Sequence, residues 1–187
     1  MEKIKDHGIL LHDGDLTLRP LREADLEEVV DWETTPGVAF ERAHENSAIE
    51  VRAHYRQVSN HNGYVWIIEF EGIAVGVFWL GMGPGDQELF EEYADTERRF
   101  IEAYVLKEYR GRGIGTSTVH QVLDFAFEAD SVEVICVNDI GSCNNYSGLK
   151  LYQKVGFKIH KPDPVPSDRS DFHYYLVLTK ESYVRPN

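Results

Sequence analysis

Cysteine is scarce in this chain, and long apolar runs are absent. Its two cysteines, Cys136 and Cys143, are too few for a disulfide framework and form no metal-ligand pattern. The eight histidines lack the spacing of a zinc motif, so no metal is expected. No stretch approaches the roughly 18 apolar residues of a membrane span, and the first residues lack the apolar core of a secretory signal. A cytoplasmic protein without a membrane partner is the expectation.

Basic residues are also few. The chain has 19 lysines and arginines against 32 aspartates and glutamates, which gives a formal net charge of -13. Nucleic-acid phosphates need a basic surface, so no nucleic-acid partner is expected. The acidic balance is compatible with a cationic partner, and it is equally compatible with solubility alone.

The pattern of apolar residues predicts a single α/β domain over residues 1–187, with a mixed sheet and no linker. Alternating or continuous apolar runs predict strands at 15–19, 64–70, 73–80, 99–106, 132–137, 157–160 and 172–178. Helical periodicity predicts four helices: 21–32, 47–58, one from the glycine turn at 110–115 through 127, and 146–155. A charged segment at 88–99 is expected to be partly helical. Pro20 is expected to stop the first strand, and a tight turn at 71–72 joins the second and third.

A glycine-rich turn, Arg-Gly-Arg-Gly-Ile-Gly-Thr-Ser at 110–117, lies between a predicted strand and a predicted helix. Such a turn leaves backbone N–H groups unpaired at the positive end of a helix, which favours a phosphate-bearing ligand. A dinucleotide motif would need a third glycine where Thr116 or Thr118 stands, depending on the first glycine counted. A nucleotide P-loop would need a Gly-Lys-Ser or Gly-Lys-Thr triplet, which is also missing.

Residues 105–115 resemble the acetyl-CoA loop of the GCN5-related N-acetyltransferase (GNAT) superfamily. Arg110, Gly113 and Gly115 match its Arg-x-x-Gly-x-Gly core. The opening at 16–25, Leu-Thr-Leu-Arg-Pro-Leu-Arg-Glu-Ala-Asp, is also similar to the start of GNAT domains.

A second GNAT-like motif follows about thirty residues later. Asn145 is followed seven residues on by Tyr152 and then by Gly-Phe at 156–157. With both motifs in the family's order, the resemblance covers roughly residues 15–180. It implies a GNAT-type sheet that is mixed and mostly antiparallel, is flanked by helices, and has a splayed pair of strands for acetyl-CoA.

The resemblance also implies where acetyl-CoA binds as co-substrate. The turn would hold the pyrophosphate, because glycines let the backbone approach it closely. The strand before the turn would pair with the pantetheine amides. The implied binding residues are Ala103, Val105, Arg110, Gly111, Arg112, Gly113, Ile114, Gly115, Thr116 and Asn145.

The implied reaction is direct attack of a primary amine on the thioester, so the chain is expected to be an acyltransferase. Tyr152 matches the family's general-acid tyrosine, although an aromatic at this position can also simply pack. Glu102 corresponds to an acidic residue on this strand in aminoglycoside-modifying members and is the candidate base. Its side chain alternates with those of Ala103 and Val105, so a solvated acid is the competing interpretation.

The acceptor is expected to be a small-molecule or peptide amine. The acidic segment 86–95 fits the recruitment of an aminoglycoside-like polycation, or a solvated surface loop. The long loop and the strand at 101–102 resemble the aminoglycoside 6'-N-acetyltransferase branch. Two alternatives stay open: an N-terminal acetyltransferase of ribosomal proteins, and a non-catalytic acyl-CoA-binding sensor on the same fold. The resemblance also suggests a homodimer.

Overall fold

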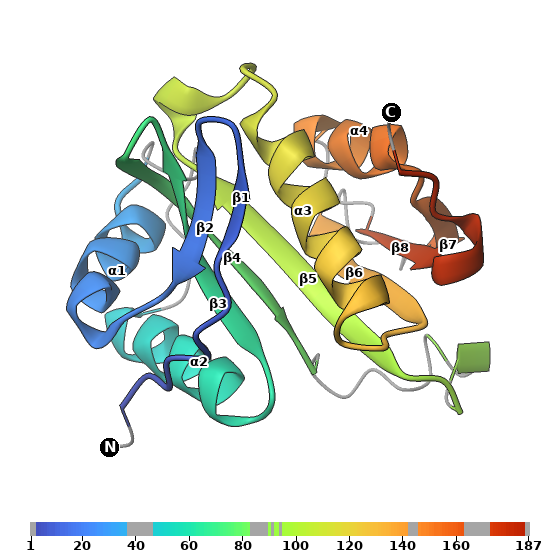
Figure 1. Ribbon diagram of the computed structural model, residues 1–187, viewed down its shortest axis with the longest axis horizontal. Coiled ribbons are helices and arrows are strands. Elements are labelled where there is room, and N and C mark those ends of the chain that lie inside the picture. The colour runs from blue at the N-terminus through green and yellow to red at the C-terminus, as the bar shows by residue number, and fades with distance from the viewer. Residues whose placement is uncertain are drawn as a thin grey trace, which may run out of the picture. The chain divides into compact units, whose positions relative to one another are not determined.

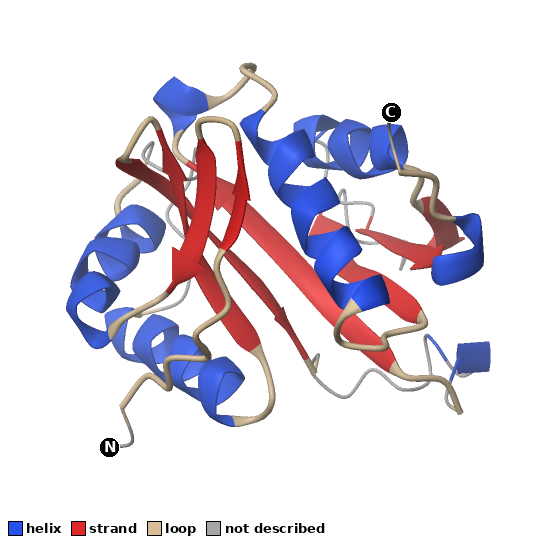
Figure 2. Ribbon diagram, in the orientation of Figure 1, coloured by secondary structure: helices blue, strands red, loops and turns tan. Residues whose placement is uncertain are grey.

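The computed structural model describes residues 3–36, 47–82, 90, 92–93, 95–141, 146–162 and 173–185. The chain forms two compact units, Met1–Met82 with Glu102–Gln121 and Gly83–Ile101 with Val122–Asn187. Strand β5 (Arg98–Val105) and helix α3 (Ile114–Glu128) each run from one unit into the other. Both units contain strands and helices (Figure 2), which confirms the expected α/β class.

The first unit is built on the strand order β1-β2-β3-β4-β5, in which β1 to β4 pair antiparallel. Its further elements are β1 (Leu11–Asp13), β2 (Leu16–Pro20), α1 (Leu26–Thr34), α2 (Ala48–Asn60), β3 (Tyr64–Phe70), β4 (Ile73–Gly81) and the short 3-10 turn η3 (Lys107–Tyr109). The three-residue β1 was not predicted, because it is too short to show an alternating pattern.

The turn between β3 and β4 confirms the predicted hairpin. Glu71 and Gly72 have φ angles of 52° and 78°, the left-handed pair that a tight two-residue turn between twisted strands needs. Pro20 ends the first predicted strand as expected: it is the last residue of β2 and lies opposite Trp66 of β3. A proline fits at this strand end because the next residue, Leu21, supplies the N–H that reaches the Val65 carbonyl at 2.8 Å.

The two helices of the first unit have well-defined starts. The 3-10 turn η1 (Glu23–Asp25) precedes α1, so the helix begins later than the predicted residue 21. The Asp25 carboxylate explains this: it accepts from the Arg19 guanidinium at 2.7 Å and from the Arg22 N–H at 2.8 Å. Helix α2 starts at a capping box in which the Ser47 hydroxyl accepts the backbone N–H of Glu50.

Helices α1 and α2 lie side by side and α2 packs on β3 and β4 (Figure 1). The buried side of α1 carries Leu26, Val29, Val30, Trp32 and Glu33. Trp66 and Trp79 of the strands are buried too. A carboxylate therefore sits among the apolar side chains that α1 turns inward.

The second unit has the strand order β5-β6-β8-β7. Arg98–Phe100 of β5 pair parallel with Val134–Cys136 of β6, whereas β8 pairs antiparallel with β6 and β7. The bounds are β6 (Val134–Gly141), α4 (Tyr146–Val155), β7 (Lys158–Pro162), β8 (His173–Thr179) and the 3-10 turn η4 (Lys180–Ser182). The predicted mixed and mostly antiparallel sheet is confirmed.

Cys136 lies fully buried in β6, and its burial raises the pKa of its thiol to about 12. Cys143 and residues 86–89, 91 and 94 of the acidic segment 86–95 lie outside the described residues. Over the described ranges, none of the helices has both the length and the apolar character needed to cross a bilayer.

Candidate active site

The glycine-rich turn has the backbone that its sequence requires. It follows η3 and leads directly into α3. Gly111 and Gly113 have φ angles of 77° and 84°, which side-chain-bearing residues rarely adopt. A Cβ built on either glycine would meet nothing within 4 Å, so the space beside both residues is open.

The N–H groups of residues 111–116 form the most distinctive feature of this turn. None of them donates to a backbone carbonyl of the described residues, and the helical ladder begins with the Ser117 N–H on the Gly113 carbonyl at 3.0 Å. The Ile114 side chain is buried and anchors the first turn of α3. Free donors at the positive end of a 15-residue helix suit an anion.

Two exposed arginines belong to this turn, one just before the donors and one among them. The Arg110 Nε donates to the Val105 carbonyl at 2.9 Å, which ties the turn to the end of β5. The Arg112 guanidinium lies over the Tyr109 ring, 5.3 Å from its centroid. Both side chains keep positive charge at the turn.

Strand β5 presents Glu102 and Tyr104 on the same face, two residues apart. The indole Nε1 of Trp79 on β4 donates to the Glu102 carboxylate at 3.0 Å. Glu102 also accepts from the Tyr104 hydroxyl, and desolvation together with this carboxylate raises the pKa of Tyr104 well above its ordinary value. Glu102 is half-buried and hydrogen-bonded, so it is not the freely solvated acid of the competing interpretation.

Glu33 belongs to the same group of side chains, and it was not predicted. It is 5% exposed, and its carboxylate accepts from the hydroxyl of the fully buried Tyr55 on α2. Burial raises the pKa of Glu33 to about 7, the Tyr55 hydrogen bond opposes this, and the charge of Glu102 adds to it. The signal was present in the sequence: Leu26, Val29 and Val30 form an apolar stripe whose next position is Glu33.

Tyr152 lies on α4 in the second unit. Its side chain is buried and meets the Phe157 ring edge to face at 5.3 Å. Glu102, Ala103, Val105 and the turn 110–116 all lie in the first unit. Asn145 lies outside the described residues.

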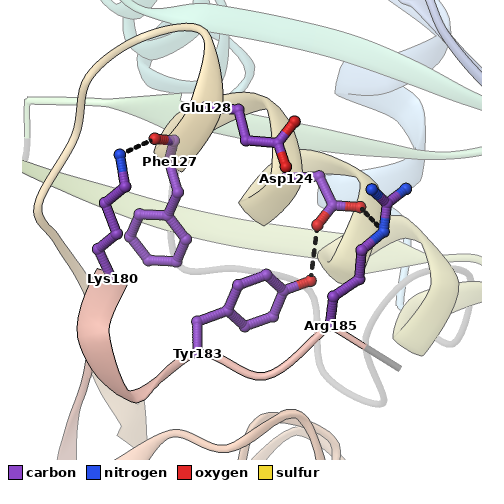
Figure 3. A pocket seen from close by; sticks show the side chains of 6 residues that line it. All are labelled: Asp124, Phe127, Glu128, Lys180, Tyr183 and Arg185. Atoms are coloured by element: carbon purple, nitrogen blue, oxygen red, sulfur yellow. Dashed lines mark hydrogen bonds and ion pairs between the residues drawn. The ribbon is translucent and has the colours of Figure 1, made fainter. Parts of the chain in front are cut away.

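A surface pocket in the second unit contains none of these residues (Figure 3). It lies between the end of α3 and the segment after β8. Asp124 accepts from the Tyr183 hydroxyl at 3.0 Å and pairs with Arg185 at 3.2 Å, and Lys180 donates to the Phe127 carbonyl. These bonds fasten the C-terminal segment to α3.

Comparison with known proteins gives a family and a fold. Residues 15–158 match the model of the acetyltransferase (GNAT) domain. The probable N-acetyltransferase camello of Xenopus tropicalis is 27% identical over 124 residues, which are 66% of this chain and 50% of that relative. The match thus spans only half the length of the relative.

Solved structures share the fold. A chimera of the spermidine N-acetyltransferase SpeG from Vibrio cholerae with hSSAT has a TM-score of 0.70 at 16% identity, over 91% of this chain and 98% of that one. The aminoglycoside acetyltransferase AAC(6')-Ib, solved with coenzyme A, has a TM-score of 0.69 at 22% identity, over 89% and 96% of the two chains. At these identities the likeness establishes the fold, and the expected fold class is confirmed.

Proposed function

Because the chain belongs to the acetyltransferase (GNAT) domain family, we propose that it is an acetyl-CoA-dependent N-acetyltransferase acting on a primary amine. The observation that carries the proposal is the run of free N–H groups at 111–116, opened by two glycines with positive φ. This cradle lies inside the matched residues, and its open space and donors fit a pyrophosphate. The proposal assigns residues 1–187 to one such domain.

The remaining cofactor contacts follow from the same geometry. Arg110 and Arg112 add charge beside the phosphates, and the Ile114, Gly115 and Thr116 N–H groups complete the cradle. The backbones of Ala103 and Val105, on the part of β5 beyond its three-residue pairing with β6, would meet the pantetheine amides. Backbone groups lie in the plane of a sheet, so the alternation of Glu102 with Ala103 is no obstacle.

When bound, acetyl-CoA supplies the thioester carbonyl that the amine attacks and the sulfur that leaves. Glu102 takes a proton from the acceptor ammonium, which frees the nitrogen lone pair for attack. The Trp79 N–H fixes one carboxylate oxygen during this step. The Tyr152 hydroxyl gives a proton to the departing sulfur.

The acceptor we favour is an aminoglycoside-like polycation. The formal charge of -13 and the carboxylates of Glu33 and Glu102 in one unit favour a cationic substrate. Two solved structures of the same fold are an aminoglycoside acetyltransferase and a chimera of a spermidine N-acetyltransferase. An N-terminal acetyltransferase of ribosomal proteins and a non-catalytic acyl-CoA sensor are the alternatives, and a cytoplasmic homodimer is the proposed setting.

Release of CoA thiol from acetyl-CoA, measured against aminoglycosides, polyamines and N-terminal peptides, tests the proposal. Saturable turnover with one class establishes the enzyme and identifies its acceptor. Acetyl-CoA binding with no turnover across the panel favours the sensor.

Tyr152→Phe tests the proton donor. We expect it to lower kcat by about 100-fold or more, as loss of a general acid does, with unchanged acetyl-CoA affinity. Tyr183→Phe is the matched control, because it removes another hydroxyl of the second unit whose partner is Asp124. Normal turnover by Tyr152→Phe contradicts the assignment.

A further inference from the structure

Residues 3–9, dark blue in Figure 1, form a strap along the first unit. They belong to no helix or strand, so hydrogen bonds to the rest of the unit hold them in place. Near one end of the strap, the Ile4 N–H donates to the Glu23 carboxylate of η1 at 2.9 Å. At the other end, the indole Nε1 of Trp66 on β3 donates to the Ile9 carbonyl at 2.9 Å.

His7 lies between these two anchors, and both of its ring nitrogens are engaged. The Nε2 lies 3.0 Å from the Val65 carbonyl oxygen of β3, and the Nδ1 lies 3.1 Å from the backbone nitrogen of Ile9. A carbonyl oxygen can only accept a hydrogen bond, and a backbone N–H can only donate one. The Nε2 must therefore carry the hydrogen and the Nδ1 must be bare, which is the neutral form of the ring.

Two aromatic side chains of β3 pack edge to face against the His7 ring. The centroids of Tyr64 and Trp66 lie 5.2 Å and 5.0 Å from its own, and the Tyr64 phenol is the titratable group that β3 brings to it. Trp66 is fully buried, and the residues paired with it, Pro20 on β2 and Phe78 on β4, carry no charge. This apolar side of the ring's surroundings favours the uncharged imidazole.

The charged groups near the ring come from the strap itself and from the helices beside it. Asp6 is the charged residue whose field acts on the ring, and its carboxylate accepts a backbone N–H of the strap at 2.8 Å. Lys3 and Lys5 are exposed, and Glu23 of η1 forms an ion pair with Arg56 of α2. Burial outweighs the attraction of the Asp6 carboxylate, so the pKa of this histidine lies below its ordinary value of 6.5.

We propose that His7 is a pH-dependent latch, which fastens the strap to β3 while its ring is neutral and releases the strap when the ring is protonated. The proton comes from the solvent and binds to Nδ1, whose lone pair accepts the Ile9 N–H. Two N–H groups then face each other, so that hydrogen bond is lost. Because the latched ring binds a proton less well than a solvated one, the strap is held most firmly above pH 6.5 and loosens as the pH falls below it.

Hydrogen exchange of the Ile9 amide, followed by NMR on the whole chain from pH 5 to 7.5, measures the latch. After correction for the intrinsic exchange rate, the protection factor should fall by up to about tenfold for each pH unit below 6.5, since opening binds one proton. In His7→Asn the side-chain oxygen can still accept the N–H two residues on, and it does not titrate. The protection factor of that variant should not change with pH.

His12→Asn is the matched control. His12 is an exposed histidine of the same unit, and its Nδ1 lies 2.9 Å from the Thr17 hydroxyl, which can donate or accept. Protonation of His12 therefore breaks no bond, and His12→Asn should keep the pH dependence of the wild type at the Ile9 amide.

The ring nitrogens of His7 give a second readout that needs no variant. Their ¹⁵N chemical shifts at pH 7.5 should be those of the neutral ring with hydrogen on Nε2. The opposite tautomer, a pH-independent protection factor in the wild type, or a fall that persists in His7→Asn overturns the inference. An equal loss of protection at the buried amides of β3 would show unfolding of the whole unit and overturns it too. None of these outcomes depends on turnover, so the proposed function is tested separately.

Discussion

Replacing Glu33 by glutamine should raise the free energy of unfolding above that of the wild type by more at pH 8 than at pH 5. Folding raises the pKa of this carboxyl from 4.5 to about 7. Between those values the folded state binds more protons than the unfolded state, so the stability of the wild type falls as pH rises. At about 1.4 kcal/mol for each pH unit, the loss approaches ~3 kcal/mol and is complete above pH 7. The amide introduced by Glu33→Gln does not titrate, so the variant escapes this loss.

Urea unfolding of both proteins at pH 5 and pH 8 measures this effect. The difference in unfolding free energy between Glu33→Gln and the wild type should change by about 2–3 kcal/mol between the two conditions. Glu27→Gln is the control: Arg52 lowers the pKa of Glu27, so this carboxyl is ionised in both states above pH 5 and its removal adds no pH dependence. The reasoning fails if the difference for Glu33→Gln is the same at both pH values.

Two further substitutions test other parts of the structure. Gly113→Ala and Gly72→Ala each force a side chain into a left-handed backbone with open space around it, so each should lower the free energy of unfolding by about 1 kcal/mol. Only Gly113→Ala should also weaken acetyl-CoA binding measured by calorimetry. Equal acetyl-CoA affinity in both variants would refute the phosphate-binding role of the turn. Tyr183→Phe removes the 3.0 Å hydrogen bond to Asp124 and should cost about 1–2 kcal/mol in urea unfolding, with no loss of turnover; an unchanged unfolding midpoint would show that this bond contributes nothing.

The sequence predicted best where a local requirement fixes the backbone. The turn at 71–72 and the helix at 146–155 have the predicted bounds, because each depends on near neighbours in the chain. Where side-chain bonds set the end of an element, the predicted end differed from the observed one by a few residues. The start of α1 next to the Arg19–Asp25 ion pair is an example.

The environment of the proposed base could not be read from the chain. Glu33 and Glu102 are 69 positions apart, and their presence in one unit depends on how α1 packs on α2 and how α2 packs on β3 and β4. A glutamate on an amphipathic helix is usually solvated, so the break in the apolar stripe carried little weight by itself. Tyr152 and Asn145 stay predictions drawn from the family resemblance.

All three tryptophans of the chain, Trp32, Trp66 and Trp79, fall in the first unit, and all are buried there. Intrinsic tryptophan fluorescence is therefore an optical reporter for that unit alone, whereas circular dichroism sees the helices and strands of both. Coincident melting curves from the two signals would describe one cooperative transition, and separated curves would describe two. The uneven placement of the indoles thus allows the unfolding of the first unit to be compared with that of the whole chain without any label.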